Sequence, residues 1–171
     1  MRLLIFLTLF SSSLFAQKKQ VSAWNMNVNL TETVALAGDV AVTGTTFSDV
    51  AGLSFAVESG VSYNFSALII YDAAQTISGA KWAVSFPTIS SGAYYTICNA
   101  TNTTFTEWAG NTADGGALSP TSLLAGNIAL IEGTITTSAA GTLKVRLACE
   151  VSGANGQITC KKGSLFRVVK L

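Results

Sequence analysis

A small set of carboxylates is the part of this sequence that could carry out a reaction. Paired carboxylates hydrolyse glycosidic bonds. The candidates are Glu58, Asp72, Glu107, Glu132 and Glu150. The 171 residues contain no histidine, so the most frequent general base and the usual zinc ligand are absent. Glu132 shares a strand face with Leu130, so we expect it to be partly buried and paired with a base such as Arg146. Because solvated turns and strand faces suit the other candidates, we predict a protein without enzymatic activity, cofactor or metal.

Aromatic side chains offer binding in place of reaction. Trp108, in "TEWAG", falls at a predicted strand end beside a long Gly-rich loop of residues 109–127. Exposed rings in such positions stack on sugars, and packing into the core is the alternative for this tryptophan. Loops at one end of a β-domain often carry recognition, and an inserted loop without a role is equally compatible with the sequence. We name Trp108, Asn111 and Asp114 as candidate contacts to a cell-surface glycan or receptor.

Three cysteines limit the redox chemistry. Cys149 and Cys160 flank "EVSGANGQIT", a sequence typical of a hairpin with a Gly/Asn loop. In an oxidising compartment this pair could form a disulfide across the hairpin. The alternative is a set of small buried thiols, and Cys98 is left over in either case.

The first residues, "MRLLIFLTLFSSSLFAQ", have the parts of a secretory signal. A basic residue precedes a short apolar run, and Ala16 is a small residue before a plausible cleavage point. We predict a signal peptide at 1–16, with an uncleaved first strand as the alternative. The protein would then be exported to the extracellular space, cell surface or periplasm, or lie on a virion surface. We expect no transmembrane segment in the mature chain.

Charge is sparse and unevenly placed along the chain. Only 11% of residues are charged, and six of the ten basic residues lie after residue 142. These bases fall at alternating strand positions, which is typical of a solvated sheet face. They are too dispersed to indicate nucleic-acid binding.

Apolar residues recur with a period of two, in short runs separated by Gly, Ser, Asn and Asp. Examples are "LSFAV", "SYNFSALIIYD", "AKWAVSF" and "TLKVRLACEV". We predict an all-β fold: an antiparallel, jelly-roll-like β-sandwich of about 8–10 strands. Residues 17–41 are expected to form an N-terminal segment with weak strands, and residues 42–171 the sandwich domain.

Four runs carry a resemblance to a known family: "GLSFAV", "YNFSALIIYDAAQTISGAKW", "GNIALIEG" and "GTLKVRLACEV". Over residues 42–169 the chain resembles a domain found at the C-terminal end of bacteriophage tail and other virion structural proteins. The resemblance implies a sandwich of the tumour-necrosis-factor type that assembles as a trimer on fibres or spikes. The chain differs in standing without a fibre shaft and in carrying an apparent signal peptide.

The strand "SYNFSALIIYD" changes character along its length. Its second face is polar at Ser62, Asn64 and Ser66 and becomes apolar at Leu68 and Ile70. Exposed apolar patches of this kind usually mark interfaces. With the resemblance, this predicts a homo-oligomer interface at Leu68 and Ile70 with Tyr71 near its rim. The alternative is that the chain's own N-terminal segment, with Trp24 and Met26, covers these residues.

Overall fold

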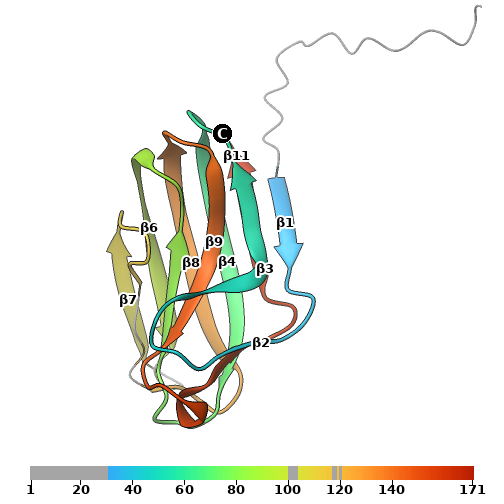
Figure 1. Cartoon of the computed structure of the whole chain (residues 1–171), viewed down its shortest axis with the longest axis vertical. Coiled ribbons are helices and arrows are strands. Elements are labelled where there is room, and N and C mark those ends of the chain that lie inside the picture. Colours follow the sequence, from blue (N-terminus) through green and yellow to red (C-terminus); the bar gives the residue numbers. More distant parts are fainter. Residues whose placement is uncertain (1–30, 100–103, 117–118, 120) are drawn as a thin grey trace, which may run out of the picture.

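The computed structural model describes residues 31–99, 104–116, 119 and 121–171. These residues form strands joined by turns and one short 3-10 helix, η1 (Ala154–Gly156). The strands are β1 (Thr31–Ala35), β2 (Val40–Val42), β3 (Ser48–Val57), β4 (Ser62–Ala73), β5 (Ala80–Ser85), β6 (Ile89–Asn99), β7 (Phe105–Gly110), β8 (Asn127–Thr137), β9 (Gly141–Cys149), β10 (Ile158–Cys160) and β11 (Leu165–Lys170) (Figure 1).

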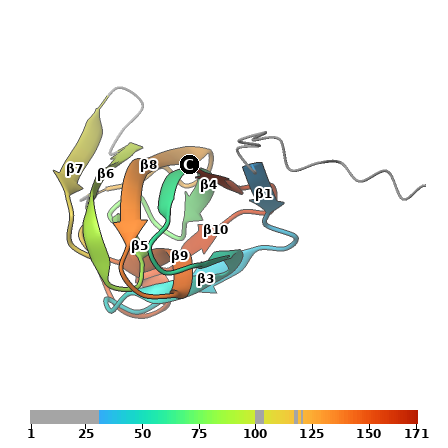
Figure 2. The same ribbon diagram turned by 90° about the horizontal axis from the view of Figure 1, so that it is seen from above.

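Two antiparallel sheets face each other. The large sheet has the strand order β1-β11-β4-β8-β6-β7, and the short strands β10 and β2 extend it from one end of β4. The small sheet has the order β3-β9-β5. Viewed from above, the strands form two layers (Figure 2). The predicted all-β, antiparallel sandwich is confirmed.

Alternation along each strand supplies the core. In β4, Tyr63, Phe65, Ala67, Ile69 and Tyr71 are all buried, because successive side chains of a strand point to opposite faces. The small sheet contributes the facing side chains in the same way. They include Leu53, Phe55, Val57, Trp82, Val84, Leu143, Val145 and Leu147.

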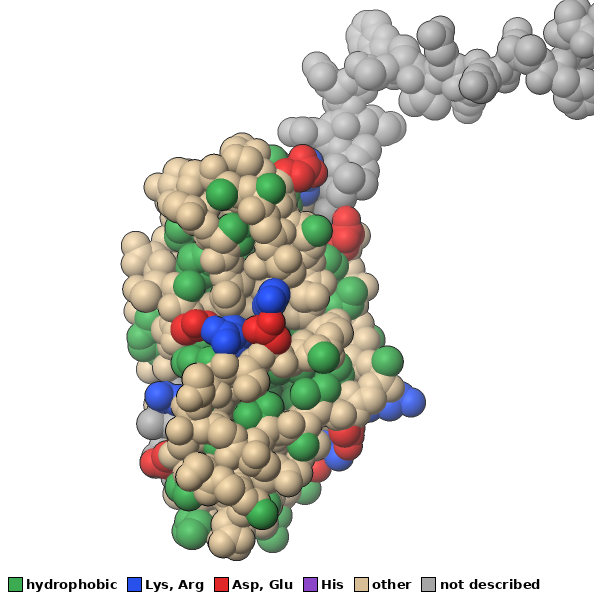
Figure 3. Space-filling view, in the orientation of Figure 1, with side chains coloured by type: hydrophobic (Ala, Val, Ile, Leu, Met, Phe, Trp, Pro, Cys, Tyr) green, Lys and Arg blue, Asp and Glu red, His purple; other side chains and the backbone are tan. Residues whose placement is uncertain are grey.

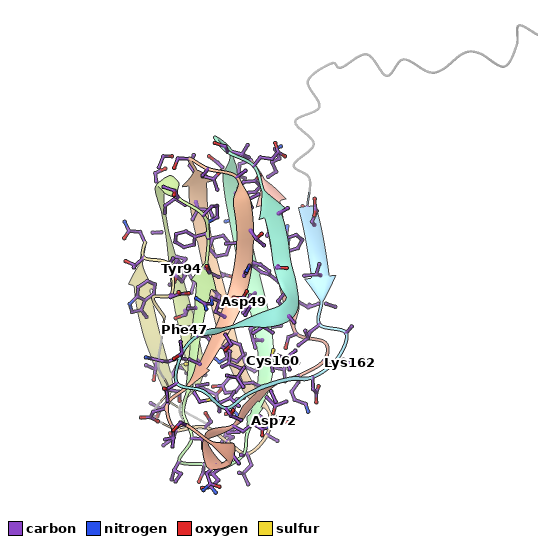
Figure 4. All side chains as sticks on the ribbon, viewed as in Figure 1. Phe47, Asp49, Asp72, Tyr94, Cys160 and Lys162 are labelled. Carbon is purple, nitrogen blue, oxygen red and sulfur yellow. The ribbon has the colours of Figure 1, made fainter. Side chains whose placement is uncertain are left out.

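Aromatic rings fill the space between the sheets. Trp82 of the small sheet packs against Tyr71 of the large sheet, with ring centroids 5.3 Å apart. Tyr94 packs against Phe65 and Phe86 farther along the sandwich (Figure 4). Tilted and edge-on ring pairs of this kind add to the stabilisation that burial already gives.

The sandwich begins earlier in the chain than residue 42, where we predicted its boundary. β1 pairs with β11 along its whole length, and β2, which contains Val42, pairs with β10. Leu36 is buried in the core, so the residues from Thr31 onward belong to the sandwich. The predicted signal peptide at 1–16 lies outside the described residues.

Candidate functional site

The outward face of the large sheet contains two of the three residues predicted to form an interface. Leu68 and Ile70 point away from the core and are 46% and 39% exposed. Tyr71 is fully buried, so its predicted place near the interface rim is wrong. The cause is its strand phase: it lies on the inward face of β4, and its hydroxyl donates to the backbone oxygen of Asn99 at 3.2 Å.

Apolar side chains continue from Leu68 and Ile70 onto the neighbouring strands. The sheet register sets Leu68 beside Leu165 of β11 on one side and beside Leu130 of β8 on the other. One step along the strands, Ile70 lies beside Ile128, which is 50% exposed. We call this region the apolar end, and it consists of Leu68, Ile70, Ile128, Leu130 and Leu165, with exposed Phe105 on β7.

The same face becomes polar toward the other end of the strands. Ser66 lies between Arg167 of β11 and Glu132 of β8, and Glu132 lies beside Tyr95 of β6. In the next row Asn64 lies beside Thr134, which lies beside Ala93. We call this region the polar end, and it consists of Asn64, Ser66, Ala93, Tyr95, Glu132, Thr134 and Arg167.

A shallow depression of about 550 Å³ lies in the polar end, over β6 and β8. Small side chains such as Ala93 and Ala109 lie along it, while Tyr95, Glu132, Asn64 and Thr134 supply its larger groups. Gly92 has a φ of 138°, which is unfavourable for residues with a side chain, and it lies next to the register shift of β6 between Ile89 and Ser91. A second depression, lined by Tyr95, Ile97, Glu107, Trp108 and Ala109, lies next to it over β6 and β7.

Tyr95 and Glu132 form a close polar pair in this depression. The Tyr95 hydroxyl donates a hydrogen bond to Glu132 Oε2. The carboxylate raises the pKa of Tyr95 above its ordinary value, because ionisation would remove the donated proton and set two negative charges together. We expected Glu132 to pair with Arg146. It shares the outward face with Leu130, as predicted, but its partner is this tyrosine.

Replacing Glu132 with glutamine should therefore lower the pKa of Tyr95. Because the folded-state pKa is raised, the contact contributes its full stabilisation at pH values below the ordinary pKa of tyrosine. That stabilisation is lost as the pH rises through the folded-state pKa of Tyr95. The measurement is ultraviolet absorbance of tyrosinate across alkaline pH, taken as the difference between each protein and its Tyr95→Phe counterpart. Burial also raises the pKa of Tyr71 and of Tyr94, and the difference measurement cancels their contribution because both residues are present in each pair of proteins. The same Tyr95 pKa in the wild type and in Glu132→Gln would contradict the pairing.

The predicted ligand contacts Trp108, Asn111 and Asp114 do not form one exposed group. Trp108 is half-buried, with its ring centroid 5.0 Å from that of Tyr94. Asn111 is exposed. Asp114 has a φ of 63° and accepts a hydrogen bond from Arg146 Nη1 at 2.5 Å. The loop that carries it runs along β5, where the Asp114 backbone nitrogen donates to Val84.

Charges on the small sheet are paired with one another. Arg146 lies between Asp114 and Asp49, and Lys144 also pairs with Asp49 at 2.7 Å. The Arg146 guanidinium lies 5.9 Å from the centre of the Phe47 ring. Figure 3 shows basic and acidic side chains next to one another across the middle of this face, and Figure 4 shows Asp49 and Phe47 in the same region. These contacts indicate a structural role for the bases that the sequence places on alternating positions.

The hairpin predicted between Cys149 and Cys160 does not form. Cys149 ends β9 of the small sheet, whereas Cys160 ends β10 of the large sheet, so the connecting residues cross between sheets. Both thiols are free and buried. The Cys149 Sγ donates to the backbone oxygen of Val42 at 3.0 Å. Burial raises the pKa of Cys160 to about 11 and that of Cys98 to about 12, which keeps these thiols protonated and unreactive at neutral pH.

Within the described residues, no group of three or more Cys, Asp and Glu side chains is arranged to hold a metal ion. No helix formed by the same residues is long and apolar enough to cross a membrane.

No family model and no curated protein matches the chain. Among solved structures, it is similar to VP2 of infectious bursal disease virus in a subviral particle, with a TM-score of 0.29 and 11% identity over 84% of this chain and 40% of that one. VP2 in T=1 particles derived from the same virus gives a TM-score of 0.30 and 11% identity over the same shares. The Gx strain gives 0.27 and 13% over 82% and 39%. The chain thus spans about two fifths of these viral chains, and TM-scores this low do not establish a shared fold.

Sequence reasoning missed the polar end as a site. Tyr95 and Glu132 are 37 residues apart and meet only through the register of β6 on β8. The available signal was weak: Glu132 follows Ile128 and Leu130 on one face of its strand, so it needs a polar neighbour.

Proposed function

We propose that this chain is a non-enzymatic structural and attachment domain of the virion type, which acts outside the producing cell or on a virion surface. In this proposal three copies associate through the apolar end, and the part of the polar end around Tyr95 and Glu132 stays open toward a cell surface. The observation that carries the proposal is the exposed apolar end itself. A solvated outer face should stay polar along its strands, whereas here large aliphatic side chains are adjacent on three neighbouring strands.

Charge on this face supports a second copy as the occupant. Arg167 lies on the β11 side, and Glu107 lies on the β7 side. Within the described part of the chain, neither residue makes an ion pair, in contrast to the bases of the small sheet. A cyclic assembly brings the β11 side of each copy against the β7 side of the next, so Arg167 and Glu107 can pair at the rim of each interface.

The alternative is that the chain's own N-terminal segment covers the apolar end. It involves Trp24 and Met26, which lie outside the described residues.

The test is the molar mass of the purified protein by light scattering across a concentration series. We expect the wild-type mass to be three times that of one chain. Leu68→Asp should give a monomer at concentrations where the wild type is a trimer. Burying one unpaired carboxylate costs about 3 kcal/mol or more, which is roughly a hundredfold in dissociation constant.

A matched control separates the interface from general surface effects. Val151 is 44% exposed, close to the exposure of Leu68, and it follows β9 of the small sheet instead of lying on the large sheet. Val151→Asp should leave the trimer intact, and neither variant should alter the melting temperature of the monomer. A wild-type monomer at every concentration, or a trimer that survives Leu68→Asp, would overturn the proposal and favour a monomeric exported binding module.

A further inference from the structure

The polar end combines four features that suit a sugar. Its depression is open and shallow, with a volume of about 550 Å³, which accommodates a short oligosaccharide. Tyr95 supplies an aromatic ring on the outer face. Glu132 supplies a carboxylate, and Asn64 and Thr134 supply an amide and a hydroxyl. We propose that this depression binds a neutral glycan, which deepens the attachment role proposed above and rests on it.

Tyr95 is held in position for stacking. Its hydroxyl bond to Glu132 spans from β6 to β8, so the side chain is fixed at both ends before any ligand arrives. An aromatic ring that is already ordered loses little conformational entropy when a sugar ring packs on it. The half-exposed state of Tyr95 leaves part of the ring to the depression.

The polar groups of the depression match sugar hydroxyls. A carboxylate accepts hydrogen bonds from hydroxyl groups, and an amide can both donate and accept. Asn64 Nδ2 makes only long bonds of 3.3 Å to the Gly133 backbone oxygen and to Thr134 Oγ1. These long contacts can be exchanged for contacts to a ligand at small cost.

The charge of the depression selects against acidic sugars. Glu132 is the only charged residue among those that line it, so an anionic glycan would meet an unbalanced carboxylate. A neutral hexose or N-acetylhexosamine chain avoids that repulsion. The apolar end borders this region through Ile97 and Glu107 of the second depression, so the glycan site and the proposed interface use different rows of the same face.

The experiment is binding of the full protein to an array of neutral oligosaccharides (cello-, malto- and chito-oligosaccharides) together with sialylated glycans as anionic probes. The tightest neutral oligosaccharide is then titrated by calorimetry. We expect Tyr95→Ala to weaken that binding at least tenfold, because a sugar ring stacked on Tyr95 loses most of its contact area when the aromatic ring is removed. Tyr95→Phe, which keeps the ring, should retain most of the affinity.

A pair of identical substitutions provides the matched control. Glu132→Gln should weaken binding several-fold, whereas Glu150→Gln, at an exposed position after β9 and outside the depression, should leave it unchanged. Binding to no neutral oligosaccharide, preference for the sialylated glycans, or equal affinity of wild type and Tyr95→Ala would each overturn the inference. Two measurements distinguish this inference from the proposed trimer. Tyr95→Ala should remain a trimer by light scattering, and Leu68→Asp should still bind the oligosaccharide as a monomer.

Discussion

Asn127→Ala should lower the free energy of unfolding by about 3 kcal/mol or more, the cost of leaving several buried polar groups without partners. Asn127 is fully buried at the start of β8. Its Nδ2 donates to the backbone oxygens of Tyr71 at 3.1 Å and Leu123 at 2.7 Å. Its Oδ1 accepts from the Leu123 backbone nitrogen at 2.7 Å and from Asn99 Nδ2 at 2.9 Å. All four hydrogen-bonding positions of the amide are therefore occupied.

The loss extends to the elements that this amide joins. Asn99 Oδ1 accepts from the Ile128 backbone nitrogen at 2.7 Å, so the two asparagines form one buried network linking β4, β6 and β8 to residues 121–126. In a low-dielectric interior such networks are strong when complete and costly when broken. Alanine is too small to fill the site and offers no polar atom, so the remaining groups stay unsatisfied or admit water.

Urea unfolding followed by tryptophan fluorescence measures this effect. Asn111→Ala is the control, because Asn111 is exposed, and exposed substitutions usually change the free energy of unfolding by less than about 0.5 kcal/mol. Equal midpoints for Asn127→Ala and Asn111→Ala would contradict the importance of the network.

Trp82→Ala should lower the free energy of unfolding by about 3–5 kcal/mol, the range for removing a large aromatic side chain from a core. Trp82 is fully buried in the centre of β5. Its ring lies against Tyr71, and it is the largest fully buried side chain among the described residues. Truncation also removes the main aromatic contact between the two sheets in this half of the sandwich.

The surroundings of Trp82 limit how far the structure can relax into the space. The chain around Gly116 lies so close that a methyl group added there would meet the Trp82 backbone oxygen at 1.9 Å. Calorimetric melting of Trp82→Ala, Trp82→Phe and Ile77→Ala tests the prediction. Phenylalanine should recover part of the stability, and Ile77→Ala should be neutral because Ile77 is 67% exposed. A melting temperature for Trp82→Ala as high as that of Ile77→Ala would contradict it.

The sequence by itself determined the class of fold and most of the core. Period-two alternation is a local property, because the pleat of each strand sends neighbouring side chains to opposite faces. It therefore predicted that Trp82, Leu143 and Val145 point inward and that Leu68 and Ile70 lie on the opposite face of β4 from Ile69. It also located the change from polar to apolar along that outer face.

The tertiary structure alone decided which residues meet. Tyr95 faces Glu132 because β6 pairs with β8 in one register, and a shift of β6 by one residue would send Tyr95 to the opposite face of the sheet from Glu132. Cys149 and Cys160 lie in different sheets because the chain crosses the sandwich between them. Arg146 pairs with Asp49 and Asp114 and not with Glu132, since β9 and β8 belong to opposite layers. Pairing between distant strands depends on the packing of the whole sandwich, which no short stretch of sequence encodes.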